Sequence, residues 1–197
     1  QSMHVLSSDD FLQHADWSFP VPIAYGPGRF DELPDHCQCL GINNPLIITD
    51  RGTASLKFVS GAADLLAHVG IASTIFHNIS QNPTENDVRN ALSVFRSADH
   101  DGVIAIGGGS GMDAGKATAL LAGSRHELWE HDFERVPPKL DPADKFPPLI
   151  CIPTTSGTGA ETESTAMITN LDRGMKLCVW HPLLKPKLTI LDPELTL

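Results

Sequence analysis

The sequence predicts an α/β fold, a Rossmann-like open, mostly parallel sheet with helices on both faces. Two observations lead to this prediction. Five short apolar runs are each bounded by Gly, Pro, Asn or Asp, and stretches with helical periodicity lie between them. The runs cover residues 45–49, 72–76, 102–106, 149–152 and 188–191. Strands that are apolar throughout are typical of parallel sheets covered on both faces, and alternation of strand and helix favours an open sheet.

Two helices are predicted from apolar side chains that recur every three or four residues. These are Leu56, Val59, Ala63, Leu66 and Val69 in the first helix, and Val88, Leu92 and Phe95 in the second. Thr84 is a candidate N-cap of the second helix, because Asp87 follows three residues later as in a capping box. Residues 123–148 combine several prolines with charges, and they predict a loop with one short helix around residues 127–132.

The composition limits the class of protein. The chain has 197 residues, of which 41% are hydrophobic, and this is enough for one domain; its first three residues resemble a remnant of an expression tag. The 24 acidic residues outnumber the 14 basic ones, which argues against a nucleic-acid partner.

Neither a membrane span nor a signal peptide is visible, so we expect a soluble, cytoplasmic protein without a membrane partner. The four cysteines are expected as reduced thiols, with Cys151 and Cys178 in the core.

A glycine-rich turn is the strongest chemical signal. Residues 107–116 read GGGSGMDAGK, follow an apolar strand directly and lead into a helical stretch at residues 117–122. Backbone N–H groups and the positive end of a helix dipole would meet there, which suits a pyrophosphate. The spacing fits neither a Walker A loop nor the G-x-G-x-x-G fingerprint. An acidic residue, Asp50, ends an earlier strand, so the candidate ribose-binding carboxylate precedes the phosphate turn. A plain tight turn is the alternative.

A second polar loop follows the next strand. Residues 153–161 read PTTSGTGAE and offer hydroxyl groups and glycine N–H groups to phosphate or ribose oxygens. The alternative is a Ser/Thr-rich turn that caps a helix near Ala160. The neighbouring glycine turn favours nucleotide binding.

Other polar residues give weaker signals. His126 and His131 resemble the H-E-x-x-H zinc motif, but the second histidine comes one position too late, so a solvated polar segment is favoured. The remaining histidines are scattered along the chain. Asp113 and Lys116 lie one helical turn apart, where an ordinary i,i+3 pair is the simplest interpretation.

The two loops together, with Asp113 and Lys116, resemble the signature loops of the iron-containing alcohol dehydrogenase family. The resemblance extends to Asn82-Pro83-Thr84 and to Leu191-Asp192-Pro193, and so covers nearly the whole chain. It implies that residues 1–197 form one dinucleotide-binding domain, similar to the N-terminal domain of dehydroquinate synthase.

The resemblance also implies which residues bind the cofactor. They are Asp50, Asn82, Gly108, Gly109, Ser110, Asp113, Thr154, Thr155, Ser156, Thr158, Met167 and Lys176. Asp50 would lie at the adenine ribose, where a carboxylate accepts a hydrogen bond from the 2′-hydroxyl and repels a 2′-phosphate. NAD is therefore favoured over NADP, although the neighbouring Arg51 keeps NADP as an alternative.

The reaction that the resemblance implies is reversible hydride transfer between an alcohol and an aldehyde or ketone, with Fe²⁺ or Zn²⁺ polarising the alcohol oxygen. In complete members of the family, a helical domain after the Asp-Pro strand end supplies the metal ligands. No catalytic or metal-binding residue is therefore assigned here, and we expect this chain alone to be inactive and to form a homodimer. The alternatives are a dehydroquinate synthase-like, glycerol dehydrogenase-like or maleylacetate reductase-like enzyme, or a non-catalytic nucleotide-binding module.

Overall fold

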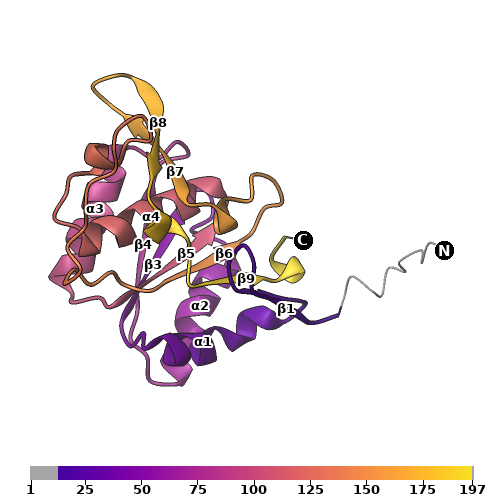
Figure 1. Ribbon diagram of the computed structural model, residues 1–197. Helices are drawn as coiled ribbons and strands as arrows, with labels where there is room; N and C mark the ends of the chain where they lie inside the picture. Colours follow the sequence, from indigo (N-terminus) through magenta and orange to yellow (C-terminus); the bar gives the residue numbers. More distant parts are fainter. Residues whose placement is uncertain (1–12, 197) are drawn as a thin grey trace, which may run out of the picture.

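The structure, a computed structural model, describes residues 13–196. Within this range one sheet of seven strands has the order β1-β2-β9-β6-β5-β3-β4 (Figure 1). Strand β1 (Ala15–Trp17) runs antiparallel to β2 (Ile23–Tyr25), and every other pair of neighbouring strands in this sheet is parallel. The predicted α/β class with a mostly parallel sheet is confirmed.

The other elements complete the architecture. The further strands of the main sheet are β3 (Pro45–Asp50), β4 (Thr74–Ile79), β5 (Gly102–Gly107), β6 (Leu149–Pro153) and β9 (Leu188–Leu191). The α-helices are α1 (Leu33–Leu40), α2 (Lys57–His68), α3 (Glu85–Ser97) and α4 (Gly109–Gly123). Strands β7 (Thr165–Asn170) and β8 (Met175–Trp180) form a separate antiparallel hairpin. Short 3₁₀ helices are η2 (Arg29–Glu32), η3 (Leu128–His131), η4 (Ala160–Thr162), η5 (Pro182–Leu184) and η6 (Pro193–Thr196). None of the described helices is both long and apolar enough to cross a membrane.

Helices cover both faces of the sheet, and the alternation of side chains along each strand supplies both cores. On β5, Ile104 and Ile106 pack with α1 and α2, whereas Val103 and Ala105 pack with α3 and α4. Figure 1 shows the two helix pairs on opposite sides of the sheet. Continuous apolar runs are therefore needed at the central strands, because both faces are buried there.

Helix α4 is buried on almost every side. It contacts β5 and β6 beneath it, α3 beside it and the β7–β8 hairpin above it. Leu120 and Leu121 form a third core with Ala166 and Ile168 of the hairpin. An added Cβ at Gly115 would lie 2.6 Å from the Cβ of Ala105, so the close approach of α4 to β5 requires glycine at this position.

The chain order reverses between β3 and β5. After β3, the chain forms β4 on one side of β3, and then crosses to form β5 on the other side. The loops that follow β3 and β5 consequently leave neighbouring strands at the same edge of the sheet. In open α/β sheets, ligands bind in the crevice at such a switch point.

Several predicted boundaries differ from the structure. Strand β4 begins later than predicted and runs on to Ile79, because it is an edge strand that tolerates exposed polar residues. Leu56 and Val69 are the caps of α2 and are about half exposed, not part of its buried face. Helix α4 begins within the glycine run, eight residues before the predicted helical stretch at residue 117.

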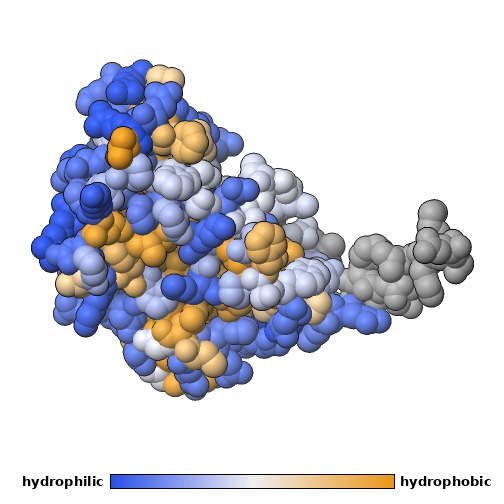
Figure 2. Space-filling model, in the orientation of Figure 1, coloured by the Kyte–Doolittle hydropathy of each residue, from blue (hydrophilic) through white to orange (hydrophobic). Residues whose placement is uncertain are grey.

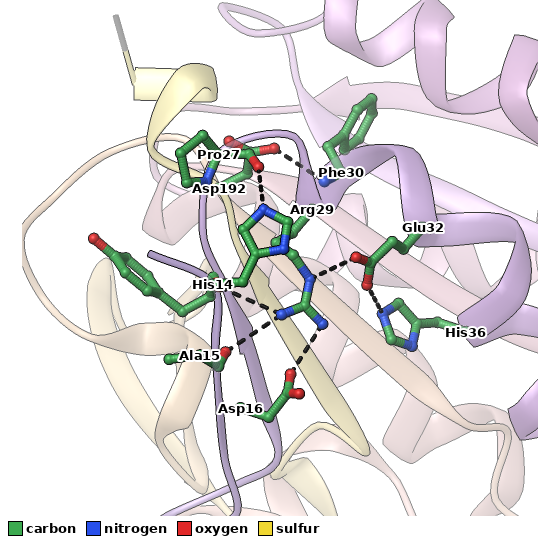
Figure 3. Close-up of polar contacts among 10 residues, drawn as sticks. His14, Ala15, Asp16, Pro27, Arg29, Phe30, Glu32, His36 and Asp192 are labelled. Atoms are coloured by element: carbon green, nitrogen blue, oxygen red, sulfur yellow. Dashed lines mark hydrogen bonds and ion pairs between the residues drawn. The ribbon is translucent and has the colours of Figure 1, made fainter. Parts of the chain in front are cut away.

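The sequence patterns did not predict β1, β2, α1 or the β7–β8 hairpin. Strands β1 and β2 have three residues each, too few for a periodic pattern. Arg29 holds this region together (Figure 3): its guanidinium bonds to Asp16, to Glu32 and to the carbonyl oxygens of Ala15 and Tyr25. Asp192, at the end of β9, accepts a hydrogen bond of 2.9 Å from the N–H of Phe30.

Candidate functional site

The glycine turn joins the end of β5 to the start of α4. Gly107 has φ of 135°, a conformation that side chains rarely adopt, and this turns the chain into the helix. Gly108 is the N-cap of α4, and no side chain caps the helix. The first N–H groups of α4 lack partners within the helix, so they can bind an anion.

Asp50 lies at the end of β3, beside the glycine turn. Its Oδ2 would lie 3.1 Å from a Cβ added at Gly107. The carboxylate accepts hydrogen bonds from the N–H groups of Gly52 (2.9 Å) and Thr53 (3.0 Å) and from the hydroxyl of Thr53 (2.8 Å). A carboxylate has about four acceptor positions, so Asp50 can hold this turn and still accept a bond from a ribose hydroxyl.

The second polar loop, residues 153–161, packs against the glycine turn. The N–H of Thr154 donates to the carbonyl oxygen of Gly107 at 3.0 Å. The hydroxyl oxygens of Thr155 and Thr158 would lie 3.4 Å and 3.7 Å from Cβ atoms added at Gly108 and Gly109, respectively. Larger side chains at these glycines would fill the space between the two loops. Both loops therefore present polar groups to one crevice.

A cavity of about 340 Å³ continues this crevice beyond the start of α4. It brings together six of the residues that the sequence predicts: Gly109, Ser110, Asp113, Thr158, Met167 and Lys176. Pro83, Ala160, Glu163 and Thr165 also line it. Sequence reasoning missed Glu163 and Thr165, because only the unpredicted hairpin brings that segment over α4.

Other predicted residues lie around this cavity. Thr155 and Ser156 line a separate hollow with Tyr25 and Asp192, so the polar loop stands between two hollows. Asn82 is exposed and does not line the 340 Å³ cavity, although its neighbour Pro83 does. The hydroxyl of Ser110 donates to the carbonyl oxygen of Gln81, which ties the start of α4 to the loop after β4.

Asp113 and Lys116 do not form the ordinary pair that their spacing suggests. No ion pair within 4 Å joins them among the described residues. The carboxylate of Asp113 accepts from the N–H of Met167 at 3.1 Å, and burial raises its pKa. The ammonium of Lys116 donates to the carbonyl oxygen of Ala160 at 2.7 Å, and burial lowers its pKa. Each side chain therefore connects α4 to a different segment.

The segment from His126 to His131 is less solvated than predicted. Leu128 and His131 are buried in the structure. Burial, together with the neighbouring His181 and His126, lowers the pKa of His131 to about 4. No group of three or more His, Cys, Asp or Glu side chains in the described part of the chain could hold a metal ion.

The cysteines are unpaired in the structure. Cys37 and Cys151 are buried, Cys178 is partly buried and Cys39 is exposed. The prediction of core packing is confirmed for Cys151, whereas Cys178 lies at the edge of the core. Burial raises the pKa of the Cys151 thiol to about 12, which disfavours the nucleophilic thiolate form.

Comparison with known proteins supports the resemblance. The family model of iron-containing alcohol dehydrogenases matches residues 20–193. The chain is 40% identical over 173 residues to 4-hydroxybutyrate dehydrogenase of Cupriavidus necator, covering 86% of this chain and 44% of that protein. It is 32% identical to choline dehydrogenase of Bacillus subtilis, covering 91% of this chain and 44% of that protein. The chain thus spans less than half the length of these relatives.

Solved structures agree with these relatives. Sulfoacetaldehyde reductase from Bifidobacterium kashiwanohense, solved in complex with NAD⁺, is 29% identical with a TM-score of 0.78, over 92% of this chain and 46% of that chain. NADH-dependent butanol dehydrogenase A from Thermotoga maritima is 26% identical with a TM-score of 0.80, over 94% of this chain and 46% of that chain. The family match, the relatives and the two signature loops lead to one conclusion: the chain belongs to the iron-containing alcohol dehydrogenase family.

Proposed function

We propose that this chain binds NAD at the carboxyl edge of its sheet and supplies the cofactor-binding half of a metal-dependent alcohol dehydrogenase. The observation that carries the proposal is the alignment of three features at the switch point: Asp50, the uncapped start of α4 and the 340 Å³ cavity. Two similar solved proteins support the choice of cofactor, one solved with NAD⁺ and one called NADH-dependent. In this proposal, residues 1–197 form the dinucleotide-binding domain.

Each feature would bind one part of the cofactor. Asp50 would accept a hydrogen bond from the adenine ribose, and the first N–H groups of α4 would bind the pyrophosphate. Thr155 and Thr158 would add hydroxyl donors from the facing loop. Met167 and Lys176, which also line the cavity, would border the nicotinamide. The bound cofactor would accept or supply the hydride, and this chain would orient its ring.

The whole reaction would be reversible oxidation of a small alcohol to an aldehyde or ketone. The described residues hold no metal site, so we assign to this chain the placement of the cofactor and derive no step through Fe²⁺ or Zn²⁺. The proposal also includes a cytoplasmic location and a homodimer, and sedimentation of the purified chain tests the latter.

Calorimetric titration with NAD and, separately, NADP tests the proposal. We expect the wild-type chain to bind NAD more tightly than NADP, and Gly109→Val to weaken NAD binding about 100-fold, roughly 3 kcal/mol, by filling the space at the start of α4. Gly61→Val, in the partly buried middle of α2 and away from the crevice, is the matched control, because an added Cβ there meets nothing nearer than 3.9 Å. A folded wild-type chain that binds neither nucleotide would contradict the proposal.

A further inference from the structure

Lys116 is a lysine without any solvent exposure. It lies on α4, two helical turns after Gly109, and its exposed fraction is 0%. Lysine is almost never buried to this degree unless a partner satisfies its ammonium group. Here the ammonium donates to the carbonyl oxygen of Ala160, a residue 44 positions away in the chain. The side chain thus crosses from the helix to the second polar loop.

Nearby acidic groups oppose part of the effect of burial on the Lys116 ammonium. Asp113, Glu161 and Glu163 lie near enough for their carboxylates to offset part of the lowering of the Lys116 pKa by burial. A hydrogen bond from a charged ammonium is about twice as strong as a neutral one. A methionine of similar length would fill the same space without the cost of desolvating a charge. Lysine therefore differs from methionine at this position by its hydrogen bond to the loop, and not by its packing.

The bond to Ala160 leads on to the cofactor crevice. The N–H of Ala160 donates to the hydroxyl oxygen of Thr158 at 3.3 Å, and Thr158 faces Gly109 across the crevice. Ala160 also begins η4, where the N–H of Thr162 donates to the carbonyl oxygen of Gly159 at 2.9 Å. Fixing Ala160 therefore fixes both the short helix and the hydroxyl that faces the glycine turn.

We propose that Lys116 is a positioning residue: it holds the 153–162 loop against α4 and so sets the gap between Thr158 and Gly109. The role in cofactor affinity rests on the proposed function above. The docking of the loop onto α4 does not depend on that function, because it follows from the Lys116–Ala160 bond alone. The docking of the loop and the effect on cofactor affinity can therefore be measured separately.

Hydrogen–deuterium exchange of the full chain measures the docking. In Lys116→Met, we expect the amides of residues 154–162 to exchange at least ten times faster than in the wild type, with β5 unchanged. Thr118→Val is the matched control, because Thr118 is equally buried on α4 but its hydroxyl donates to Ala114 within the same helix. The control should leave exchange in residues 154–162 unchanged, and Lys116→Arg should restore part of the protection.

Cofactor titration of the same variants measures the effect of Lys116 on NAD affinity. We expect Lys116→Met to weaken NAD binding at least tenfold and Thr118→Val to change it less than threefold. Unchanged exchange and affinity in a folded Lys116→Met chain would overturn the positioning role. A wild-type chain that fails to bind NAD would refute the proposed function, while the exchange measurement would still decide the docking.

A measurement on the wild type alone covers the case in which Lys116→Met does not fold. If Lys116 docks the loop, the amides of Ala160 and Thr162 should share the protection of the neighbouring turns of α4. Exchange of these amides at the rate of an exposed loop would overturn the proposal.

Discussion

In the proposed function, Asp50 combines two tasks in one carboxylate. It closes the turn after β3 through the N–H groups of Gly52 and Thr53, and we propose that it also accepts a hydrogen bond from a ribose hydroxyl. Removing the whole side chain would therefore disturb the turn as well as the charge. Asparagine separates the two tasks, because its carbonyl oxygen still accepts the backbone bonds while the negative charge is lost.

We expect Asp50→Asn to reduce discrimination against NADP about tenfold, or about 1.4 kcal/mol, because a 2′-phosphate is no longer repelled. The free energy of unfolding should fall by less than about 1 kcal/mol. Titration with both nucleotides and urea unfolding measure the two effects, with the exposed Asp172→Asn as control. An unchanged ratio of NAD to NADP affinity would show that Asp50 does not read the ribose.

We expect His131 to make the stability of the chain depend on pH. Its pKa is lowered to about 4 in the folded state, first by burial and then by His181 and His126, against 6.5 as its ordinary value. The unfolded chain therefore binds the extra proton between these two pH values. The stabilisation of the neutral form is complete above pH 6.5 and is lost as the pH falls toward 4.

Between pH 7 and pH 4, the wild type should lose about 3 kcal/mol more unfolding free energy than His131→Phe, which cannot titrate. Urea unfolding at a series of pH values measures the difference between the two chains. His68→Phe is the control, because His68 is exposed at the end of α2. Parallel pH profiles for wild type and His131→Phe would show that His131 does not carry this dependence.

The glycines of α4 have two different surroundings. Gly109 borders the crevice between the two polar loops, where an added Cβ would meet the Thr158 hydroxyl at an ordinary 3.7 Å. Gly115 lets the helix approach β5, where an added Cβ would lie only 2.6 Å from the Cβ of Ala105. Gly109 therefore borders the crevice of the proposed cofactor site, and Gly115 is required for packing.

Gly115→Ala should destabilise the fold by about 1–3 kcal/mol, because the backbones of α4 and β5 must separate. This loss should exceed the gain of about 1 kcal/mol that alanine brings to a helix interior. Gly109→Ala, its matched control on the same helix, should unfold at nearly the same urea concentration as the wild type. Equal unfolding midpoints for all three chains would contradict this account of the α4–β5 contact.

The capping box of α3 shows why some elements were predictable. Thr84 accepts from the N–H of Asp87 at 3.2 Å, and Asp87 accepts from the N–H of Thr84 at 2.9 Å. Both residues lie within four positions of each other, so the sequence alone contains the whole interaction. The β7–β8 hairpin has no such local signal, since its apolar side is defined by its packing on α4.

Across the whole molecule, polar side chains cover most of the face in Figure 2, with apolar residues gathered in patches between them. The chain has a net charge of −10, and its candidate site uses few of those charges. Asp113, Glu163 and Lys176 line the cavity, but no set of metal ligands accompanies them among the described residues.

We therefore expect no measurable turnover when the purified chain is mixed with NAD, a primary alcohol and Fe²⁺ or Zn²⁺. Absorbance of NADH measures the reaction, and 1,3-propanediol dehydrogenase of Klebsiella pneumoniae, a relative with 30% identity, provides a positive control with 1,3-propanediol. Turnover by this chain without a second polypeptide would contradict the assignment of the cofactor half alone.

The buried strands, the capping box and the glycine turn could be predicted from the amino-acid sequence, because each depends on neighbouring residues, and the two polar loops together indicated the family. Which side chains reach across the fold follows instead from how the folded chain packs. Lys116 bonds to Ala160, Asp113 bonds to Met167, and His131 is buried beside His181. These contacts join residues more than forty positions apart, so they depend on how the hairpin and the polar loop pack on α4. Local periodicity carries no information about such packing.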